Sequence, residues 1–473
     1  MRIIRMLELV ICVISCLSSI GFSYSNYGQV ILNIDSPSFR RLVVANPQFA
    51  IEPSSDMRLE KLALKTAEEL GQLLEFTGYF KVMDPAGYKD LVGKIPNKSA
   101  KFIPGFEGLD YLKWKALGVE SLNNGKLIRT NEGDIRLELR TADFNKGNRV
   151  LGKAYTISQE SDLIYALKQY VDRLLMAYTG KPGVFSSKVA FIGRKKRGDS
   201  KQLFICDIDG KNLQQLTFGK TPHLSPAWSP DGSQILFTSY ESGNPDLYMI
   251  DIKTHDITNI AAYQGLNSGG VFSSNGKLIA FSGSIKGNTE IYLKSANINS
   301  STRRPFLQGH GIDVDPAFSP DGKWLAFVSG RYGNPHIFKA QLVWNEEKSQ
   351  VKAVSDTRLT YAGWYNATPA WTPDSQKIAF AGFDRDIGRF DIFLMNHNGR
   401  KLERLTIRSG DNESPTWSPN GQLIIFQSNR IGKTDRKGRS QLYIMNRDGS
   451  NQRRIYTGLY DAQMPKWGPF LLK

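Results

Sequence analysis

The sequence is poor in cysteine, with three in 473 residues. Cys12 and Cys16 lie within the first 25 residues, which leaves Cys206 alone in the rest of the chain. A single cysteine can form neither an internal disulfide nor a Cys-based zinc site. We expect Cys206 to be a small apolar side chain in a strand over Leu203–Cys206 rather than a nucleophile.

The motifs of common active sites are also missing. No Gly-x-Ser-x-Gly nucleophile elbow occurs, and Gly219-Lys220-Thr221 and Gly432-Lys433-Thr434 lack the first glycine of a phosphate-binding loop. The five histidines are scattered without paired spacing, so we expect no metal site and no cofactor. A pair of carboxylates for acid/base chemistry stays open, although nothing in the sequence singles one out. The chain is therefore expected not to be an enzyme.

Charge is unbalanced, with a formal net charge of +16. The basic runs at 194–197 and 433–439 lie between expected strands and lack the interleaved aromatic residues that stack on bases. We interpret them as solvated hairpin tips and expect no nucleic-acid partner. They favour an anionic envelope surface or an acidic partner without defining a site.

The first 25 residues resemble a secretory signal peptide. Arg2 and Arg5 precede apolar residues, and the small residues Gly21, Ser23 and Ser25 offer a cleavage point. Two alternatives remain, a lipid anchor on Cys16 after the lipobox-like Val13-Ile14-Ser15 and a retained membrane anchor. The leading expectation is export to the periplasm with cleavage near residues 23–25.

Residues 26–183 alternate the periods of strands and helices. Strands are expected at 29–34, 79–83, 135–139 and 153–157. One helix is expected after the N-cap candidates Ser54, Ser55 and Asp56, with an apolar stripe of Leu59, Leu62, Ala63, Leu70, Leu73 and Leu74. A second helix is expected after Ser161 and Asp162. This pattern predicts a small N-terminal α/β domain.

From residue 184 to 473 the sequence carries a repeat, with copies about 44 to 53 residues apart. Each copy joins an aromatic residue to a turn, as in Ala227-Trp228-Ser229-Pro230-Asp231-Gly232, where Pro fixes φ and Gly tolerates positive φ. The further copies are centred on Phe272, Phe318, Trp371, Trp417 and Trp467. This spacing is typical of four-stranded propeller blades.

The first and the last unit of the repeat are each incomplete, and this indicates how the ring closes. The first unit, from Lys188, lacks an inner strand, and an unmatched inner strand stands at 462–467. If these two join in one blade, the sheet keeps no exposed edge. The sequence thus predicts an α+β multi-domain chain, an N-terminal α/β domain followed by a six-bladed β-propeller closed by the C-terminal strand.

The loops that enter the inner strands should surround the mouth of the central channel. Their small, polar and acidic residues suit the docking of a protein or peptide, although each residue alone could merely build its turn. The candidate residues are His223, Leu266, Asn267, Asp313, Val314, Asn366, Ala367, Asn412, Glu413 and Asp461.

Three segments resemble the TolB family of the Gram-negative Tol–Pal envelope system. They are the blade segment Leu224–Gly243, the junction Leu174–Ala190 and the N-terminal motif Trp114–Val119. The repeat alone occurs in many propeller proteins, but its combination with an α/β domain and an export signal is specific. The resemblance covers the whole chain after the leader.

The resemblance implies an adaptor, expected to be a monomer, that supports outer-membrane integrity and invagination during cell division. It implies binding of a Pal-like peptidoglycan-associated lipoprotein at the propeller mouth, where Leu266, Gly269 and Val314 fall on the facing loops. It implies binding of a TolA-like inner-membrane protein through the N-terminal segment, in which the residues are Tyr27, Gln29, Val30, Ile31, Leu32, Asn33 and Ile34. Leu266, Gly270 and Ser274 depart from the family's usual His and Pro residues.

Two other classes of function stay open. A propeller hydrolase or peptidase-associated protein would carry a carboxylate or Ser–His cluster in a closed pocket. A polysaccharide-binding lectin would expose aromatic side chains on its blade faces.

Overall fold

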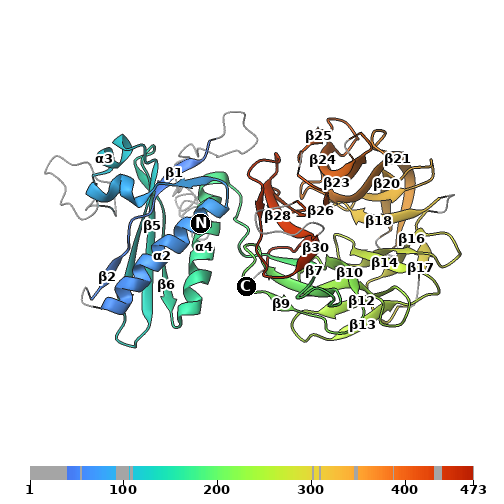
Figure 1. The fold of residues 1–473 in the computed structure, drawn as a ribbon, viewed down its shortest axis with the longest axis horizontal. Coiled ribbons are helices and arrows are strands. Elements are labelled where there is room, and N and C mark those ends of the chain that lie inside the picture. Colours follow the sequence, from blue (N-terminus) through green and yellow to red (C-terminus); the bar gives the residue numbers. More distant parts are fainter. Residues whose placement is uncertain are drawn as a thin grey trace, which may run out of the picture.

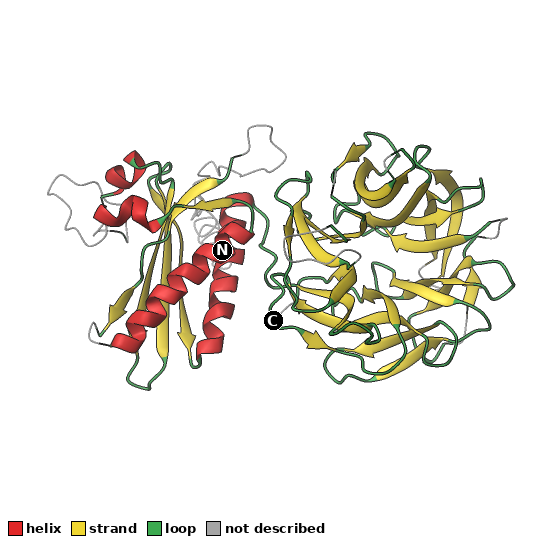
Figure 2. Ribbon diagram, viewed as in Figure 1, coloured by secondary structure: helices red, strands yellow, loops and turns green. Residues whose placement is uncertain are grey.

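The structure is a computed structural model that describes residues 40–53, 56–91, 106, 110–300, 303–307, 311–345, 350–386, 388–407, 409–430 and 439–471. A domain with a single sheet, on the left in Figure 1, precedes a six-bladed propeller on the right. Among the described residues, helices occur in the N-terminal domain alone (Figure 2). The expected signal peptide, Cys16 and Tyr27–Ile34 lie outside the described residues.

The N-terminal sheet has the order β3-β1-β4-β5-β6, with β2 paired to β4. Its strands are β1 Leu42–Ala45, β2 Ala50–Glu52, β3 Phe80–Val82, β4 Ser121–Arg129, β5 Ile135–Asp143 and β6 Asn148–Ile157. β1 runs parallel to β3 and β4, whereas β4, β5 and β6 form an antiparallel meander. The expected strands at 79–83, 135–139 and 153–157 are confirmed, and β1, β2 and β4 were not foreseen.

Two long helices, α2 (Met57–Phe76) and α4 (Glu160–Thr179), lie side by side on one face of this sheet (Figure 1). Asp56 caps α2 by accepting the backbone N–H groups of Arg58 and Leu59. The predicted stripe is buried at Leu59, Ala63, Leu70, Leu73 and Leu74, and Leu62 is half-buried against the same core. α4 begins one turn earlier than expected, because Gln159 rather than Ser161 or Asp162 is its N-cap.

The other elements of this domain are short. They are the 3₁₀ helix η1 (Pro85–Leu91) and α3 (Tyr111–Ala116), neither of which the sequence patterns indicated. Trp114 on α3 is buried against Tyr88, with ring centroids 5.2 Å apart. The segment that resembles the family motif therefore builds a small second core.

The propeller consists of six four-stranded antiparallel sheets. The first two blades are β10 His223–Trp228, β11 Gln234–Ser239, β12 Asp246–Asp251, β13 Ile257–Ala261; and β14 Asn267–Phe272, β15 Leu278–Gly283, β16 Glu290–Ser295, β17 Arg303–Pro305. The next two are β18 Asp313–Phe318, β19 Trp324–Ser329, β20 His336–Asn345, β21 Gln350–Arg358; and β22 Tyr365–Trp371, β23 Lys377–Asp384, β24 Arg389–Asn396, β25 Glu403–Arg404. The last two are β26 Asn412–Trp417, β27 Leu423–Ser428, β28 Gln441–Asn446, β29 Arg453–Arg454; and β30 Asp461–Trp467, β7 Lys188–Arg194, β8 Gln202–Asp207, β9 Gln214–Gln215.

The ring closes as the sequence predicted. The strands β10, β14, β18, β22, β26 and β30 contact one another in this order, and β30 contacts β10 again, so they are the inner strands. β30 pairs with β7, which joins the C-terminus to the first strand of the repeat. The prediction of six blades with a C-terminal closing strand is confirmed.

The repeated turn is stabilised by its own side chains. Ser229 Oγ donates to Asp231 and accepts the N–H of Gln234, and the equivalent Ser or Thr and Asp or Asn residues do the same in the next four blades. The tryptophan tightens the ring, because the indole of Trp371 donates to Ala317 O of the preceding blade at 3.0 Å. Trp228 and Trp417 make the equivalent bond.

One hydrophobic core crosses the domain boundary. It runs from the leucines of α2 and α4 through Phe185 to Val189 and Trp467. Phe76 and Phe185 have ring centroids 5.6 Å apart, and Tyr79 Oη donates to Gln422 of the fifth blade at 3.0 Å. Cys206, 1% exposed, belongs to this core, and burial raises the pKa of its thiol, as expected for an apolar role.

Candidate functional site

Every inner strand bends near the channel mouth. The bulge residues Ser225, Asp315, Thr368, Ser414 and Met464 have φ between 51° and 54°, and Gly269 occupies the same place in the second blade. A non-glycine residue in this region costs about 1–2 kcal/mol, so five such positions mark a feature that the fold must enforce. A proline follows the bulge residue in five blades, and Gly270 follows in the second.

The structure places six of the predicted mouth residues at the start of the inner strands and buries them. They are His223, Asn267, Asp313, Asn366, Asn412 and Asp461. The Asn412 amide donates to Asp391 at 3.0 Å and to Gly410 O, and the Asn267 amide donates to Asp246 and to Gly265 O. These side chains hold the mouth loops in place, and their contact with a partner stays a prediction.

The other predicted mouth residues differ in their access to solvent. Leu266, Gly269, Val314 and Glu413 are half-buried, whereas Ala367 is buried. Burial raises the pKa of Glu413, although the Gln427 amide donates to its carboxylate at 2.8 Å. Partner contact by these five residues also stays a prediction.

Two opposite charges face each other across the channel. Asp315 lies on the third inner strand and Lys466 on the sixth, and these strands are on opposite sides of the six-bladed propeller. Burial raises the pKa of Asp315 and lowers that of Lys466, and each charge acts on the pKa of the other. The Asp315 carboxylate also accepts the backbone N–H of Thr368 on the fourth inner strand at 3.3 Å, so it is held between two neighbouring blades while it acts on Lys466 through space.

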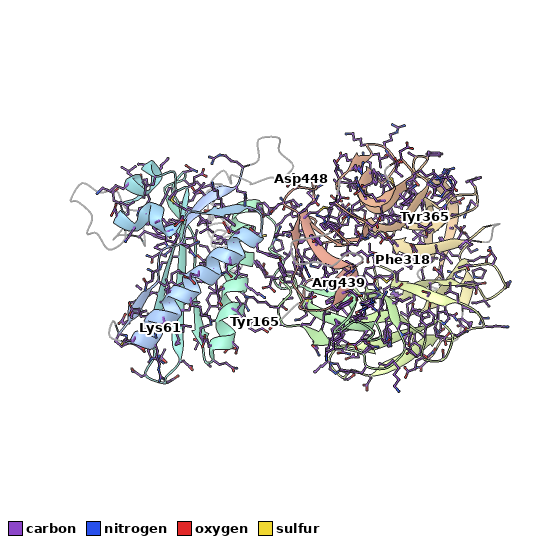
Figure 3. All side chains as sticks on the ribbon, viewed as in Figure 1. Lys61, Tyr165, Phe318, Tyr365, Arg439 and Asp448 are labelled. Atoms are coloured by element: carbon purple, nitrogen blue, oxygen red, sulfur yellow. The ribbon has the colours of Figure 1, made fainter. Side chains whose placement is uncertain are left out.

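An aromatic rim that the sequence patterns did not indicate lies beside the mouth. We define it as Tyr332, Arg358, Tyr361, Trp364 and Arg385. Tyr332 and Tyr361 are 70% and 73% exposed. The Arg358 guanidinium lies 4.8 Å from the Tyr361 ring centroid, and that of Arg385 lies over Trp364. Tyr365, labelled in Figure 3, continues this rim on the fourth blade. The aromatic residues in the linker between the third and fourth blades are the feature of the sequence that could have indicated this rim.

The remaining chemistry of the described residues is sparse. No group of three His, Cys, Asp or Glu side chains among them is arranged to hold a metal ion. Asp391 is buried on β24 and pairs with Arg404. In the part of the chain that the structure describes, no helix has the length and apolarity needed to cross a membrane.

Comparison with known families matches residues 176–471 to the TolB beta propeller domain. The chain belongs to the TolB propeller family. This match covers the junction and all six blades of the ring.

Individual relatives agree with the family assignment. The "Tol-Pal system protein TolB" of Bordetella pertussis is 33% identical over 229 residues, 48% of this chain and 51% of the relative. That of Desulfosudis oleivorans is 32% identical over 286 residues, 60% of this chain and 61% of the relative. The chain thus spans about half to three fifths of the length of these curated relatives.

One solved structure resembles both domains together. The crystal structure of TolB from Acinetobacter baumannii superposes with a TM-score of 0.71 at 25% identity, covering 91% of this chain and 97% of that chain. The likeness therefore includes the N-terminal domain, which the family match does not.

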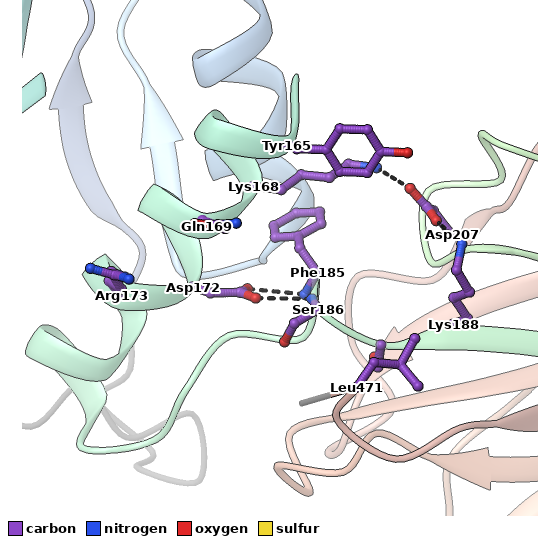
Figure 4. Close-up of a pocket in the computed structure, with 11 residues that line it drawn as sticks. Tyr165, Lys168, Gln169, Asp172, Arg173, Phe185, Ser186, Lys188, Asp207 and Leu471 are labelled. Atoms are coloured by element: carbon purple, nitrogen blue, oxygen red, sulfur yellow. Dashed lines mark hydrogen bonds and ion pairs between the residues drawn. The ribbon is translucent and has the colours of Figure 1, made fainter. Parts of the chain in front are cut away.

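In this TolB-family chain the two domains meet through a buried charge cluster. Lys168 of α4 donates to Asp207 at 2.7 Å and lies 3.0 Å from Asp209, and Lys188 reaches the same Asp207 (Figure 4). Burial lowers the pKa of Lys168, but Asp209 and Asp207 outweigh it and raise the pKa overall. The Lys168 ammonium is thus held charged, 4% exposed, between helix and propeller.

The linker between the domains is tied to α4 by a second carboxylate. Asp172 accepts the backbone N–H groups of Phe185 at 2.9 Å and Ser186 at 3.0 Å (Figure 4). Burial raises the pKa of Asp172 to about 6. A cavity of about 350 Å³ lies beside these residues, lined also by Tyr165, Arg173 and Leu471.

Proposed function

We propose that this protein is the periplasmic TolB-type adaptor of a Tol–Pal envelope system and a binding protein rather than an enzyme. Its propeller mouth binds a Pal-like peptidoglycan-associated lipoprotein, and its N-terminal segment Tyr27–Ile34 binds a TolA-like inner-membrane protein. In this role it supports outer-membrane integrity and invagination during cell division, after export and cleavage near residues 23–25.

Two observations together support this proposal: the family match and the side chains at the propeller mouth. Relatives over the propeller are named Tol-Pal system proteins TolB. The mouth brings together half-exposed apolar loop residues, two opposed channel charges and a rim of Tyr, Trp and Arg. Tyr, Trp and Arg are the side chains that dominate binding at protein interfaces.

The mouth is tested with the soluble domain of the organism's own Pal-like lipoprotein. Val314→Arg places a long charged side chain at the mouth, and we expect it to weaken binding at least about tenfold. Lys253→Glu, in the turn between β12 and β13 at the opposite end of the blade, serves as a control that changes charge away from the mouth. A wild-type chain that does not bind the lipoprotein would refute this part of the proposal.

The N-terminal segment is tested by deleting Tyr27–Ile34. We expect this deletion to abolish capture of the TolA-like protein while binding of the Pal-like lipoprotein persists or tightens. Loss of both partners by a chain that still folds would contradict a separate role for the segment.

A polysaccharide-binding role is the second candidate, because Tyr332 and Tyr361 are exposed. Arg358 lies over both rings, at 5.9 Å and 4.8 Å from their centroids, and occupies faces that a sugar ring would need. This arrangement favours a protein partner. Retention of the chain on insoluble peptidoglycan without any added lipoprotein would favour the saccharide instead.

A further inference from the structure

A cavity of about 400 Å³ opens beside the channel mouth in the closing blade. One wall is the hairpin between β7 and β8, and the other is the chain that leaves β9. The Gln202 amide ties the walls together by donating to Gly219 O at 3.2 Å and to Thr221 O at 3.1 Å. The cavity therefore has a fixed frame at the partner-facing end of the ring.

The lining of this cavity carries an excess of basic side chains. Arg194, Lys195 and Lys220 contribute cations, and Asp199 contributes a carboxylate that already accepts the N–H of Lys196 at 2.9 Å. Arg194 pairs with Asp461, whereas Lys195 and Lys220 make no ion pair within the described part of the chain. The two lysines are exposed and leave positive charge over the opening.

A polar group of the lining also lacks a partner. Ser200 Oγ is buried and makes no hydrogen bond with the described residues. A phosphate oxygen entering between the lysines could accept from this hydroxyl, because phosphate takes several donors at once. The hydroxyl and the two ammonium groups are the donors that such an anion requires.

An exposed aromatic residue directly precedes the cavity wall in the chain. Phe218 is 74% exposed and precedes Gly219 and Lys220 of the cavity wall. Its backbone is fixed because Thr217 Oγ1 accepts the N–H of Leu203 and donates to Gln202. If the cleft binds a free anion, the Phe218 ring stays in water. If it binds a lipid surface, the ring can be buried at the boundary between headgroups and acyl chains.

We propose that this cleft binds the phosphate of an anionic phospholipid headgroup, with Phe218 inserted at the membrane boundary. Lys195 and Lys220 bind the phosphate, and Lys196 and Arg197 on the same hairpin add attraction to the surface. The site is separate from the binding of the Pal-like lipoprotein and does not depend on it. It brings the mouth of the propeller close to a membrane.

The test is co-sedimentation of the full chain with phosphatidylcholine vesicles, with and without phosphatidylglycerol. We expect binding only with phosphatidylglycerol and a loss of affinity of about 30-fold for the double variant Lys195→Glu, Lys220→Glu. The matched control is Lys253→Glu, Lys277→Glu, which changes net charge equally at the opposite end of the ring and should change affinity by less than about twofold. Phe218→Ser should weaken binding, whereas Tyr456→Ser, at another exposed ring, should not.

Each other outcome contradicts the proposal. Equal loss by both charge-reversal pairs means that diffuse charge, not this cleft, attracts the vesicles. An unchanged Phe218→Ser variant means that the ring does not insert. Binding of soluble glycerol phosphate without vesicle binding means that the cleft takes free anions only. Circular dichroism of every variant confirms that the fold is retained.

Discussion

The Arg194 guanidinium contacts the Asp461 carboxylate at 2.5 Å and joins residues 267 positions apart. Arg194 ends the first repeat strand, and Asp461 begins the last, so this ion pair lies where the ring closes. Asp461 is buried and Arg194 is half-buried, which weakens screening by water compared with a surface pair.

Loss of this pair should loosen the closing strand. We expect Asp461→Ala to lower the free energy of unfolding by about 1–3 kcal/mol, because the arginine loses its buried acceptor. Lys65→Ala removes the exposed pair with Glu160 and should change stability by less than about 1 kcal/mol. Denaturant titration measures both, and deletion of residues 460–473 should open the ring altogether. A truncated chain that melts like the parent would rule out the latch.

The Asp172 carboxylate of α4, which binds the linker between the domains, makes stability depend on pH. The pKa of Asp172 rises from 3.8 to about 6 on folding, so its contribution to stability is present below about 3.8 and is lost as the pH rises through about 6. Asp172→Asn stays neutral, and we expect its Tm relative to wild type to increase between pH 4 and 7. Asp231→Asn gives the opposite slope at lower pH, because the hydrogen bond from Ser229 lowers the pKa of Asp231 and its contribution to stability is lost only as the pH falls below about 3.8. A constant difference between wild type and Asp172→Asn would contradict the burial effect.

The second blade carries Gly270 where the other five blades carry proline, and the space there is too small for a side chain. A Cβ on Gly270 would lie 2.6 Å from Leu247 Cδ1, and Leu247 is fully buried. We expect Gly270→Ala to destabilise the chain by about 1–3 kcal/mol through overpacking. Combined with Leu247→Ala, it should cost less than the sum of the single changes. Gly330→Ala, which has room for a Cβ, is the control, and strict additivity of the pair would argue against the contact.

The aromatic rim predicts where a partner's footprint lies. We expect Trp364→Ala to weaken binding of the Pal-like lipoprotein by about 1–3 kcal/mol without lowering Tm, because large aromatic residues beside arginine dominate interfaces. Tyr456→Ala removes a more exposed ring near the fifth blade and should leave affinity unchanged. Isothermal titration separates the two. Equal effects of both variants would mean that the footprint is not centred on the third and fourth blades.

Local chemistry was enough to predict most of the fold. Pro, Asp and Gly of the repeated turn have backbone preferences that act within four residues, and α2 shows its buried face through the spacing of leucines. The ring closure followed from one unmatched strand at 462–467. By contrast, β1 and β2 escaped prediction because strands of four and three residues are specified by their neighbours rather than by their own sequence. β4 is nine residues long, but Asn123, Asn124 and Gly125 in it are residue types typical of turns.

The site depended more on the assembled structure than the fold did. The sequence located the mouth loops, because every inner strand follows one, but it could not show that Asn267, Asp313 and Asn412 turn inward to hold those loops. It did not indicate that Arg358, at the end of β21, packs against the ring of Tyr361 in the linker that follows.

By itself the sequence determined the repeat, the blade count and the scarcity of cysteine chemistry, since each rests on residue type and spacing along the chain. Only the tertiary structure decided which charges meet. Lys168 finds Asp207 across the domain junction, Asp315 faces Lys466 across the channel, and Lys195 and Lys220 share one cleft. Electrostatic contacts depend on distance through space and on burial, and neither is written in the order of residues.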